Sequence, residues 1–115
     1  MKNRNYFDEI IEIARNVCSE DDYLDKDKGK KHDRAMKKFE KIAKELEQVD
    51  CNDMLVALLQ IDEEKVKLIT GSLCLKLKVL TQFAIAELEK VVKSRDSSLS
   101  YTAYMTIKMF KQGRL

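Results

Sequence analysis

The stretch MLVALLQIDEEKVKLITGSLCLKL, residues 54–77, decides the fold of this chain. Its first part, Met54–Leu59, is the longest uninterrupted apolar run and is far too short to span a membrane. Asp50 or Asn52 can cap a short helix here, and Asp62 can cap the next helix. The residues that recur at helical spacing are Leu55, Leu58 and Leu59, then Val66, Ile69, Thr70, Leu73 and Leu77. The stretch therefore predicts two consecutive amphipathic helices.

A second pair of helices follows with the same pattern. Thr81 can begin one helix, Ser97 or Ser98 the next, and Gly113 supplies a stop signal. A shift of 33 residues aligns Leu55 with Leu88, Leu58 with Val91, Leu59 with Val92, Val66 with Leu99, Thr70 with Ala103, Cys74 with Ile107 and Leu77 with Phe110. Such a period is typical of helical solenoids, although two amphipathic hairpins can also resemble each other by chance.

Residues 4–49 predict a separate helical cap. Apolar residues at helical spacing from Tyr6 to Cys18 indicate a first helix over roughly residues 4–19. The polar stretch 19–29 then predicts a charged loop, and an apolar stripe indicates a second helix that ends at about Val49. We therefore expect one all-α domain of about six helices over residues 1–115, with the cap at 4–49 and two helix pairs at 51–112.

Composition narrows the class of protein. The chain has 115 residues, 44% of them hydrophobic and 37% charged, with no proline and a net charge of +2. This charge is too small to indicate a nucleic-acid partner by itself. No apolar leader follows Met1, and an odd number of cysteines, Cys18, Cys51 and Cys74, is typical of reduced, buried thiols. We expect a cytoplasmic protein without a membrane segment.

Part of the sequence resembles a known repeat. The segment LLQIDEEKVK, residues 58–67, resembles the LL-x-x-D-x-x-x-V-R turn of HEAT-type repeats, with Lys67 where arginine is usual. The whole chain is similar to a family of small bacterial proteins of unknown function with a HEAT-like helical fold. This similarity rests on Tyr6-Phe7-Asp8 before the charged loop, on the basic-aromatic helix at 31–46, and on the ending AYMTIKMFKQG, residues 103–113.

The resemblance implies a shape rather than a reaction. It implies a short HEAT-like α-α superhelix with an N-terminal helical cap, and the family has no established activity. The chain departs from the family pattern at Gly71 and Ser72, where alanines are common, and it lacks the prolines often found between the helices.

The residues offer little catalytic chemistry. His32, the only histidine, begins a lysine-rich helix, where we expect it to be solvated, and no zinc-ligand spacing can be written. Cys74 is expected in the core, although Lys67 and Lys78 on the same helix leave a reactive thiol as an alternative. The acidic cluster 62–64 begins a helix and is explained by capping. We predict no enzymatic activity, no metal and no cofactor, and keep an enzyme that uses Cys74 or the acidic clusters as a weaker alternative.

The last helix carries the first of two candidate partner surfaces. Tyr101, Tyr104 and Lys108 lie on one side of it, away from its core line, and tyrosine beside lysine suits protein recognition. In a HEAT-like stack the helices at 62–78 and 97–112 would share a concave face, which adds Lys67 and Lys78. The sequence predicts a protein-binding module with an unidentified protein partner, and a bacterial immunity or antitoxin-like role against an acidic partner is one version. Alternatively, the tyrosines pack on a neighbouring helix or on the N-terminal segment.

The second candidate surface is basic. Its five cations along one predicted helix are Lys30, Arg34, Lys37, Lys41 and Lys44. Such a stripe can follow phosphates, which makes a backbone-directed nucleic-acid binder the alternative function. The near-neutral net charge, the interspersed acids and the lack of an aromatic residue among these cations favour a solvated helix face instead.

Overall fold

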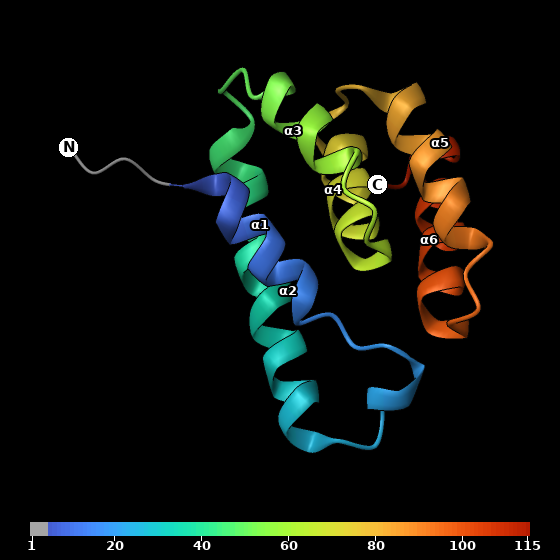
Figure 1. Ribbon diagram of the computed structural model, residues 1–115. Coiled ribbons are helices and arrows are strands. Elements are labelled where there is room, and N and C mark those ends of the chain that lie inside the picture. Colours follow the sequence, from blue (N-terminus) through green and yellow to red (C-terminus); the bar gives the residue numbers. More distant parts are fainter. Residues whose placement is uncertain (1–4) are drawn as a thin grey trace.

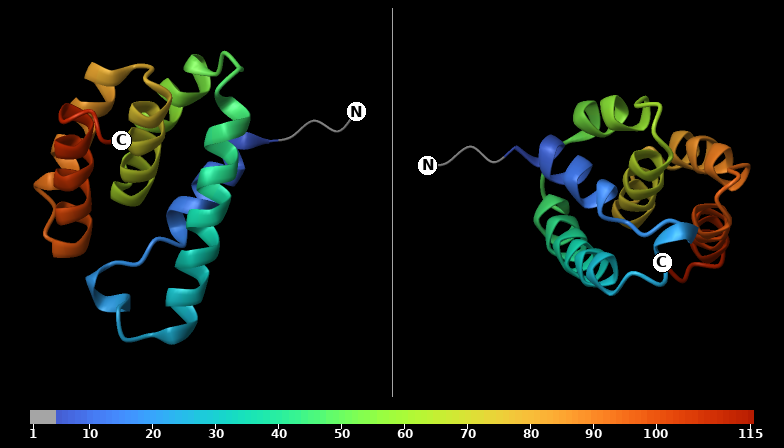
Figure 2. Two further views of the ribbon diagram at one scale, coloured as in Figure 1. Left: turned by 180° about the vertical axis from the view of Figure 1, so that it is seen from behind. Right: turned by 60° about the horizontal axis from the view of Figure 1, so that its bottom comes forward.

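The chain is built around helix α4 (Glu64–Leu77), which lies inside a ring formed by the other helices (Figure 2). The structure is a computed structural model and describes residues 5–115, which form six α-helices and one 3-10 helix and contain no strand. The all-α prediction is confirmed. The remaining elements are α1 (Tyr6–Arg15), η1 (Glu20–Asp22), α2 (Lys26–Leu46), α3 (Asn52–Leu59), α5 (Thr81–Val92) and α6 (Ser97–Lys111) (Figure 1).

Helix α4 is buried on nearly every side, because it contacts each of the other five α-helices. Residues 66–71 and 73–75 are all buried, including Lys67 and Thr70, whereas Leu77 is only half-buried. The prediction of one inward stripe ending at Leu77 was therefore too narrow. A stripe describes a helix at the surface of a layer, and α4 occupies the centre.

Gly71 allows α5 to pack closely on α4. A Cβ atom at this position would lie 2.6 Å from Cγ of Leu88 on α5, which is closer than non-bonded carbon atoms approach in proteins, so Leu88 would have to move. Glycine within a helix costs about 1 kcal/mol relative to alanine. The tight contact with the fully buried Leu88 offsets this cost and explains the glycine at this position.

Several helix ends differ from the predicted ones. Helix α1 ends at Arg15 rather than near residue 19, and its predicted start at residue 4 lies outside the described residues. Helix α2 ends at Leu46, which leaves Val49 52% exposed. The loop predicted for 19–29 ends at Asp25, because the Asp25 carboxylate accepts hydrogen bonds from the amides of the first turn of α2 and caps that helix. The predicted starts of α5 and α6 and the stop at Gly113, whose φ is 70°, are confirmed.

Each helix pair contains an equivalent hydrogen bond, in addition to the common apolar pattern. Lys67 donates to the carbonyl of Leu59, the last residue of α3, and Ser100 donates to the carbonyl of Val92, the last residue of α5. These two contacts are related by the same shift of 33 residues. The pairs do not stack as adjacent layers, since α3 and α5 make little contact with each other and α4 contacts both members of the second pair. The HEAT-like superhelix itself stays a prediction.

Candidate functional site

The outer side of α6 carries the residues that we call the tyrosine face, namely Tyr101, Tyr104 and Lys108. Tyr101 is 64% exposed and Tyr104 is 51% exposed, so neither tyrosine packs into the molecule. The ammonium group of Lys108 lies 6.0 Å from the centre of the Tyr104 ring. Residues 97–115 include no Asp or Glu, so acidic side chains of this helix do not compensate the charge of Lys108.

The 33-residue shift relates the tyrosine face to a covered side of α4. Tyr101 corresponds to Leu68, Tyr104 to Gly71 and Lys108 to Leu75. All three α4 residues are buried, and α5 lies against Gly71. The tyrosine face is thus the side of the second pair on which a further helix would pack if the chain continued the same arrangement.

Lys67 does not belong to any binding surface, which corrects the prediction. It is 8% exposed, and its ammonium group donates to the Glu87 carboxylate of α5 at 2.6 Å and to the Leu59 carbonyl at 2.8 Å. A buried ammonium group needs such partners, because it is costly to remove from water. The prediction that Lys67 lies on a concave face between α4 and α6 is therefore wrong, because Lys67 is buried against Glu87.

Glu87 is held as a carboxylate by two lysines. Burial alone would raise the pKa of Glu87, but hydrogen bonds from Lys67 and Lys90, together with their charges, outweigh burial and lower it. Lys90 lies one turn along α5 and contacts the second carboxylate oxygen at 2.8 Å. The pair Lys67–Glu87 therefore joins α4 and α5 as a structural contact.

Lys78 is exposed, but it ends helix α4 and is not part of the tyrosine face. It ends α4 in the left-handed conformation, with φ of 59°, and its amide donates to the Leu75 carbonyl. Of the five predicted contact residues, the structure thus brings together Tyr101, Tyr104 and Lys108 on one helix face, leaves Lys78 at a helix end and buries Lys67.

The basic stripe runs along the solvent side of α2, and its five side chains are exposed: Lys30, Arg34, Lys37, Lys41 and Lys44. Within residues 5–115 none of the five forms an ion pair. Arg34 and Lys41 also line a groove of about 570 Å³ between α1 and α2, which Glu9 and Glu12 line from the other side. The groove therefore presents both signs of charge.

The cysteines and the histidine take part in packing and hydrogen bonds rather than in a reactive site. Cys74 is fully buried, and burial raises its pKa to about 12, so its thiol is protonated at neutral pH. Burial, reinforced by the charge of Asp22, also raises the pKa of Cys18. His32 is half-buried rather than solvated, because its Nδ1 atom accepts a hydrogen bond from the Cys18 amide at 3.0 Å. The part of the chain that the structure describes contains no cluster of three or more metal-ligating side chains.

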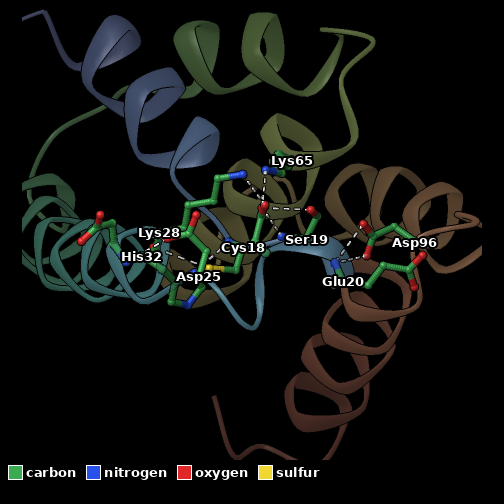
Figure 3. A network of polar contacts seen from close by, with 10 residues as sticks. Cys18, Ser19, Glu20, Asp25, Lys28, His32, Lys65 and Asp96 are labelled. Atoms are coloured by element: carbon green, nitrogen blue, oxygen red, sulfur yellow. Dashed lines mark hydrogen bonds and ion pairs between the residues drawn. The ribbon is translucent and has the colours of Figure 1, made fainter.

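Residues 16–25 form a strap that bridges α2 and α6, and sequence reasoning did not predict this order (Figure 1). On the α6 side the Glu20 amide donates to Asp96, the N-cap of α6, and the Ser97 amide donates to the Glu20 carboxylate at 2.9 Å. Each carboxylate thus satisfies an amide at the start of the other helix. Figure 3 shows Glu20 beside Asp96 on one side of the strap.

The strap is also tied to α2 and α4. Asp22 pairs with Lys28 of α2 at 2.8 Å and with Lys65 of α4 at 4.0 Å. The hydrogen bond from Lys28, with those from Ser19, lowers the pKa of Asp22 well below its usual range. In Figure 3 Cys18 and Ser19 lie between Lys28 and His32 on one side and Glu20 on the other. The strap is therefore anchored to three helices.

A cavity of about 510 Å³ lies beneath the strap, and we call it the strap cavity. Its lining residues are Val17, Cys18, Asp22, Tyr23, Gly29, His32, Asp33, Met36, Phe39, Glu40, Leu68, Ile69, Ser72, Ser98, Thr102 and Thr106. Met36 and Phe39 belong to the apolar stripe that predicted α2, and sequence reasoning missed their partial exposure at a cavity. Helical periodicity cannot find such a cavity, because its walls come from three stretches that are far apart in the chain, 17–40, 68–72 and 98–106.

Comparison with known protein families, with curated proteins and with solved structures finds no match to this chain. None of the helices in residues 5–115 is both long and apolar enough to cross a membrane.

Proposed function

We propose that this chain is a non-enzymatic protein-binding module whose tyrosine face docks a helix of an acidic partner protein. The observation that carries the proposal is the correspondence between the open face of α6 and the covered face of α4. A helix of the partner would lie on Tyr101 and Tyr104 as α5 lies on Gly71. Lys108, in a segment without acids, would pair with a carboxylate of that helix.

The side chains are suited to this task. Tyrosine supplies a large contact area with few rotatable bonds, and its hydroxyl group can donate or accept a hydrogen bond. Exposed aromatic residues near a cation are the residue types on which protein interfaces most depend for affinity. A role as an immunity or antitoxin-like protein that neutralises an acidic partner is one specific form of the proposal. Cytoplasmic location and membership of the HEAT-like bacterial family belong to the same proposal.

Crosslinking from the surface tests where the partner binds. A photoreactive benzoylphenylalanine is placed at Tyr104, and a matched probe is placed at Leu24, which is 98% exposed and lies on the strap. We expect the probe at residue 104 to capture an acidic protein from the source cells, and Tyr101→Ala to reduce that capture. Capture of the same proteins by both probes, or capture that is insensitive to Tyr101→Ala, would contradict the proposed face.

A nucleic-acid binder that uses the basic stripe is the alternative function. It is favoured by the exposure of all five cations on α2 and by their lack of ion-pair partners within residues 5–115. Phosphate contacts would make binding fall steeply with salt. The test is retention on heparin or DNA at low salt, with Lys37→Glu/Lys41→Glu as the variant. Retention that disappears at moderate salt and in this variant supports the alternative, and no retention at low salt rejects it.

A further inference from the structure

The strap cavity is separate from the tyrosine face. Thr102 and Thr106 line it from a side of α6 that differs from the side of Tyr101 and Tyr104, since successive helical residues turn by about 100°. Its volume of about 510 Å³ falls within the range of about 300–1,000 Å³ that is typical of small-molecule sites.

The cavity is preformed, because the strap above it is held at both ends. The Tyr23 hydroxyl group forms a 2.8 Å hydrogen bond with Ser98 of α6, and the Cys18 amide donates to His32 of α2. Together with the anchors at Asp22 and Glu20, these contacts fix the rim without filling the space below. A ligand would therefore not have to order this part of the chain when it binds.

Three of the hydroxyl groups that line the cavity, those of Ser72, Thr102 and Thr106, can only accept hydrogen bonds from a ligand. Ser72 donates its single hydroxyl proton to the Leu68 carbonyl at 2.7 Å, and Thr102 and Thr106 donate theirs to carbonyls one turn earlier in α6. The oxygen atoms keep their lone pairs, which makes them acceptors. The side-chain acceptors of the cavity thus favour a ligand rich in N–H groups.

The charges of the residues that line the cavity also favour a positively charged ligand. The lining includes three carboxylates and no lysine or arginine. Asp22 is paired with Lys28 and Glu40 with Lys76, at 2.8 and 2.7 Å, whereas Asp33 has no ion-pair partner within residues 5–115. Asp33 therefore leaves one negative charge for a ligand to neutralise.

The remaining surface is apolar. Leu68 and Ile69 of α4 are buried behind it, and Met36 and Phe39 of α2 are half-buried. A small inorganic cation would leave the apolar side chains of Met36 and Phe39 exposed to water. We propose that the strap cavity binds a small amphipathic amine, whose ammonium group faces Asp33 and the hydroxyl acceptors while its apolar body covers Met36 and Phe39.

Three probes of one shape test this proposal by NMR titration of the amide signals of the full chain. Phenethylamine is the cation, 2-phenylethanol the neutral analogue and phenylacetate the anion. We expect phenethylamine to bind several-fold more tightly than the alcohol, phenylacetate not to bind, and the shifted signals to cluster around the cavity. Equal binding of all three probes, or shifts centred outside the cavity, would overturn the proposal.

Two variants locate the site. Asp33→Asn should weaken phenethylamine binding about three- to fivefold and remove the preference over the alcohol, as expected for a partly exposed ion pair. The control Glu89→Gln removes an exposed carboxylate of α5 outside the cavity and should change neither value. Ser72→Leu should fill the cavity and abolish binding. Should Ser72→Leu not fold, Asp33→Asn decides alone, and an unchanged preference for the amine in that variant rejects the site.

A lysine side chain of a peptide carries the same ammonium chemistry. The capped tripeptide Gly-Lys-Gly is therefore titrated in parallel with phenethylamine. We expect the tripeptide to bind more weakly, because it lacks an aromatic body for Phe39. Tighter binding of the tripeptide in the cavity would overturn the assignment to a small amine. Because Tyr101 and Tyr104 do not line the cavity, these outcomes are independent of the crosslinking test of the tyrosine face.

Discussion

Helices α4 and α6 occupy equivalent positions in the two helix pairs and have opposite environments. Both place an apolar stripe against the preceding helix, and each is linked to the end of that helix by a side-chain hydrogen bond, from Lys67 and from Ser100. Helix α4 is then covered on its remaining sides, whereas α6 presents Tyr101 and Tyr104 to solvent. In both pairs the apolar stripe holds the two helices together. The residues on the opposite side of the second helix determine whether that helix is buried, as α4 is, or exposed to a partner, as α6 is.

The largest expected change in the free energy of unfolding comes from removing the two equivalent hydrogen-bond donors, Lys67 and Ser100. Lys67→Ala leaves the buried Glu87 with only Lys90, and we expect a loss of about 3 kcal/mol in the free energy of unfolding. Ser100→Ala removes a neutral donor and should cost about 1 kcal/mol. Urea denaturation at neutral pH measures both.

A matched double variant separates charge from packing at the same place. Lys67→Met combined with Glu87→Leu removes both charges and keeps the volume, so it should lose less stability than Lys67→Ala alone. Equal losses for Lys67→Ala and Ser100→Ala would contradict the distinction between a central α4 and a peripheral α6.

The next effect concerns Gly71 and its counterpart Tyr104. In Gly71→Ala the added Cβ must displace Leu88, and overpacking of this kind costs about 1–3 kcal/mol, of which better helix propensity returns about 1 kcal/mol. We expect a net loss of about 1 kcal/mol, against at most about 0.5 kcal/mol for Tyr104→Ala at an exposed position. A stabilising Gly71→Ala, measured in the same urea experiment, would show that α5 does not lie close to α4.

Acid should destabilise the surroundings of α4. The pKa values of Glu87 and Asp22, which contact Lys67 and Lys65 of α4, are lowered in the folded protein. The unfolded chain therefore binds more protons, so their contribution is complete above the usual carboxyl pKa of about 4 and is lost as the pH falls through the folded values. Unfolding free energies from pH 7 to pH 3 should decrease, and more gently in Glu87→Gln. A slope that Glu87→Gln leaves unchanged would contradict the role of this group.

The smallest effect is the absence of a reaction at Cys74. A thiol reagent should modify Cys18 and Cys51 in the folded protein and leave Cys74 unmodified, because Cys74 is buried and its pKa is raised to about 12. Mass spectrometry after brief labelling identifies the modified residues. Rapid modification of Cys74 would return the enzyme alternative to consideration and would show that α4 is accessible.

The sequence predicted which residues form helices better than it predicted where the helices lie. Periodicity located α5 and α6, and Thr81 and Gly113 marked their ends, because these signals are local. The burial of Lys67 depends on Glu87, which lies 20 residues away on another helix, and a lysine in a helix is normally exposed.

Of the candidate sites, one could be predicted from the sequence and the other could not. The exposure of Tyr101 and Tyr104 follows from their position opposite the apolar stripe of one helix, so it could be predicted. The strap and its cavity depend on the contact between Glu20 and Ser97, which are 77 residues apart. Such a contact has no periodic signature, and the polar composition of residues 19–29 indicated only a loop.

The role of the tyrosine face is tested most directly by the affinity of the partner captured at residue 104 for three forms of the chain. These are the wild type, Tyr101→Ala/Tyr104→Ala, and Leu24→Ala as the exposed control. We predict that the tyrosine variant binds at least about tenfold more weakly, as expected when interface aromatic residues are removed, with an unchanged free energy of unfolding, while the control binds like the wild type. Equal affinities for all three forms would contradict the claim that the open side of α6 is the binding surface.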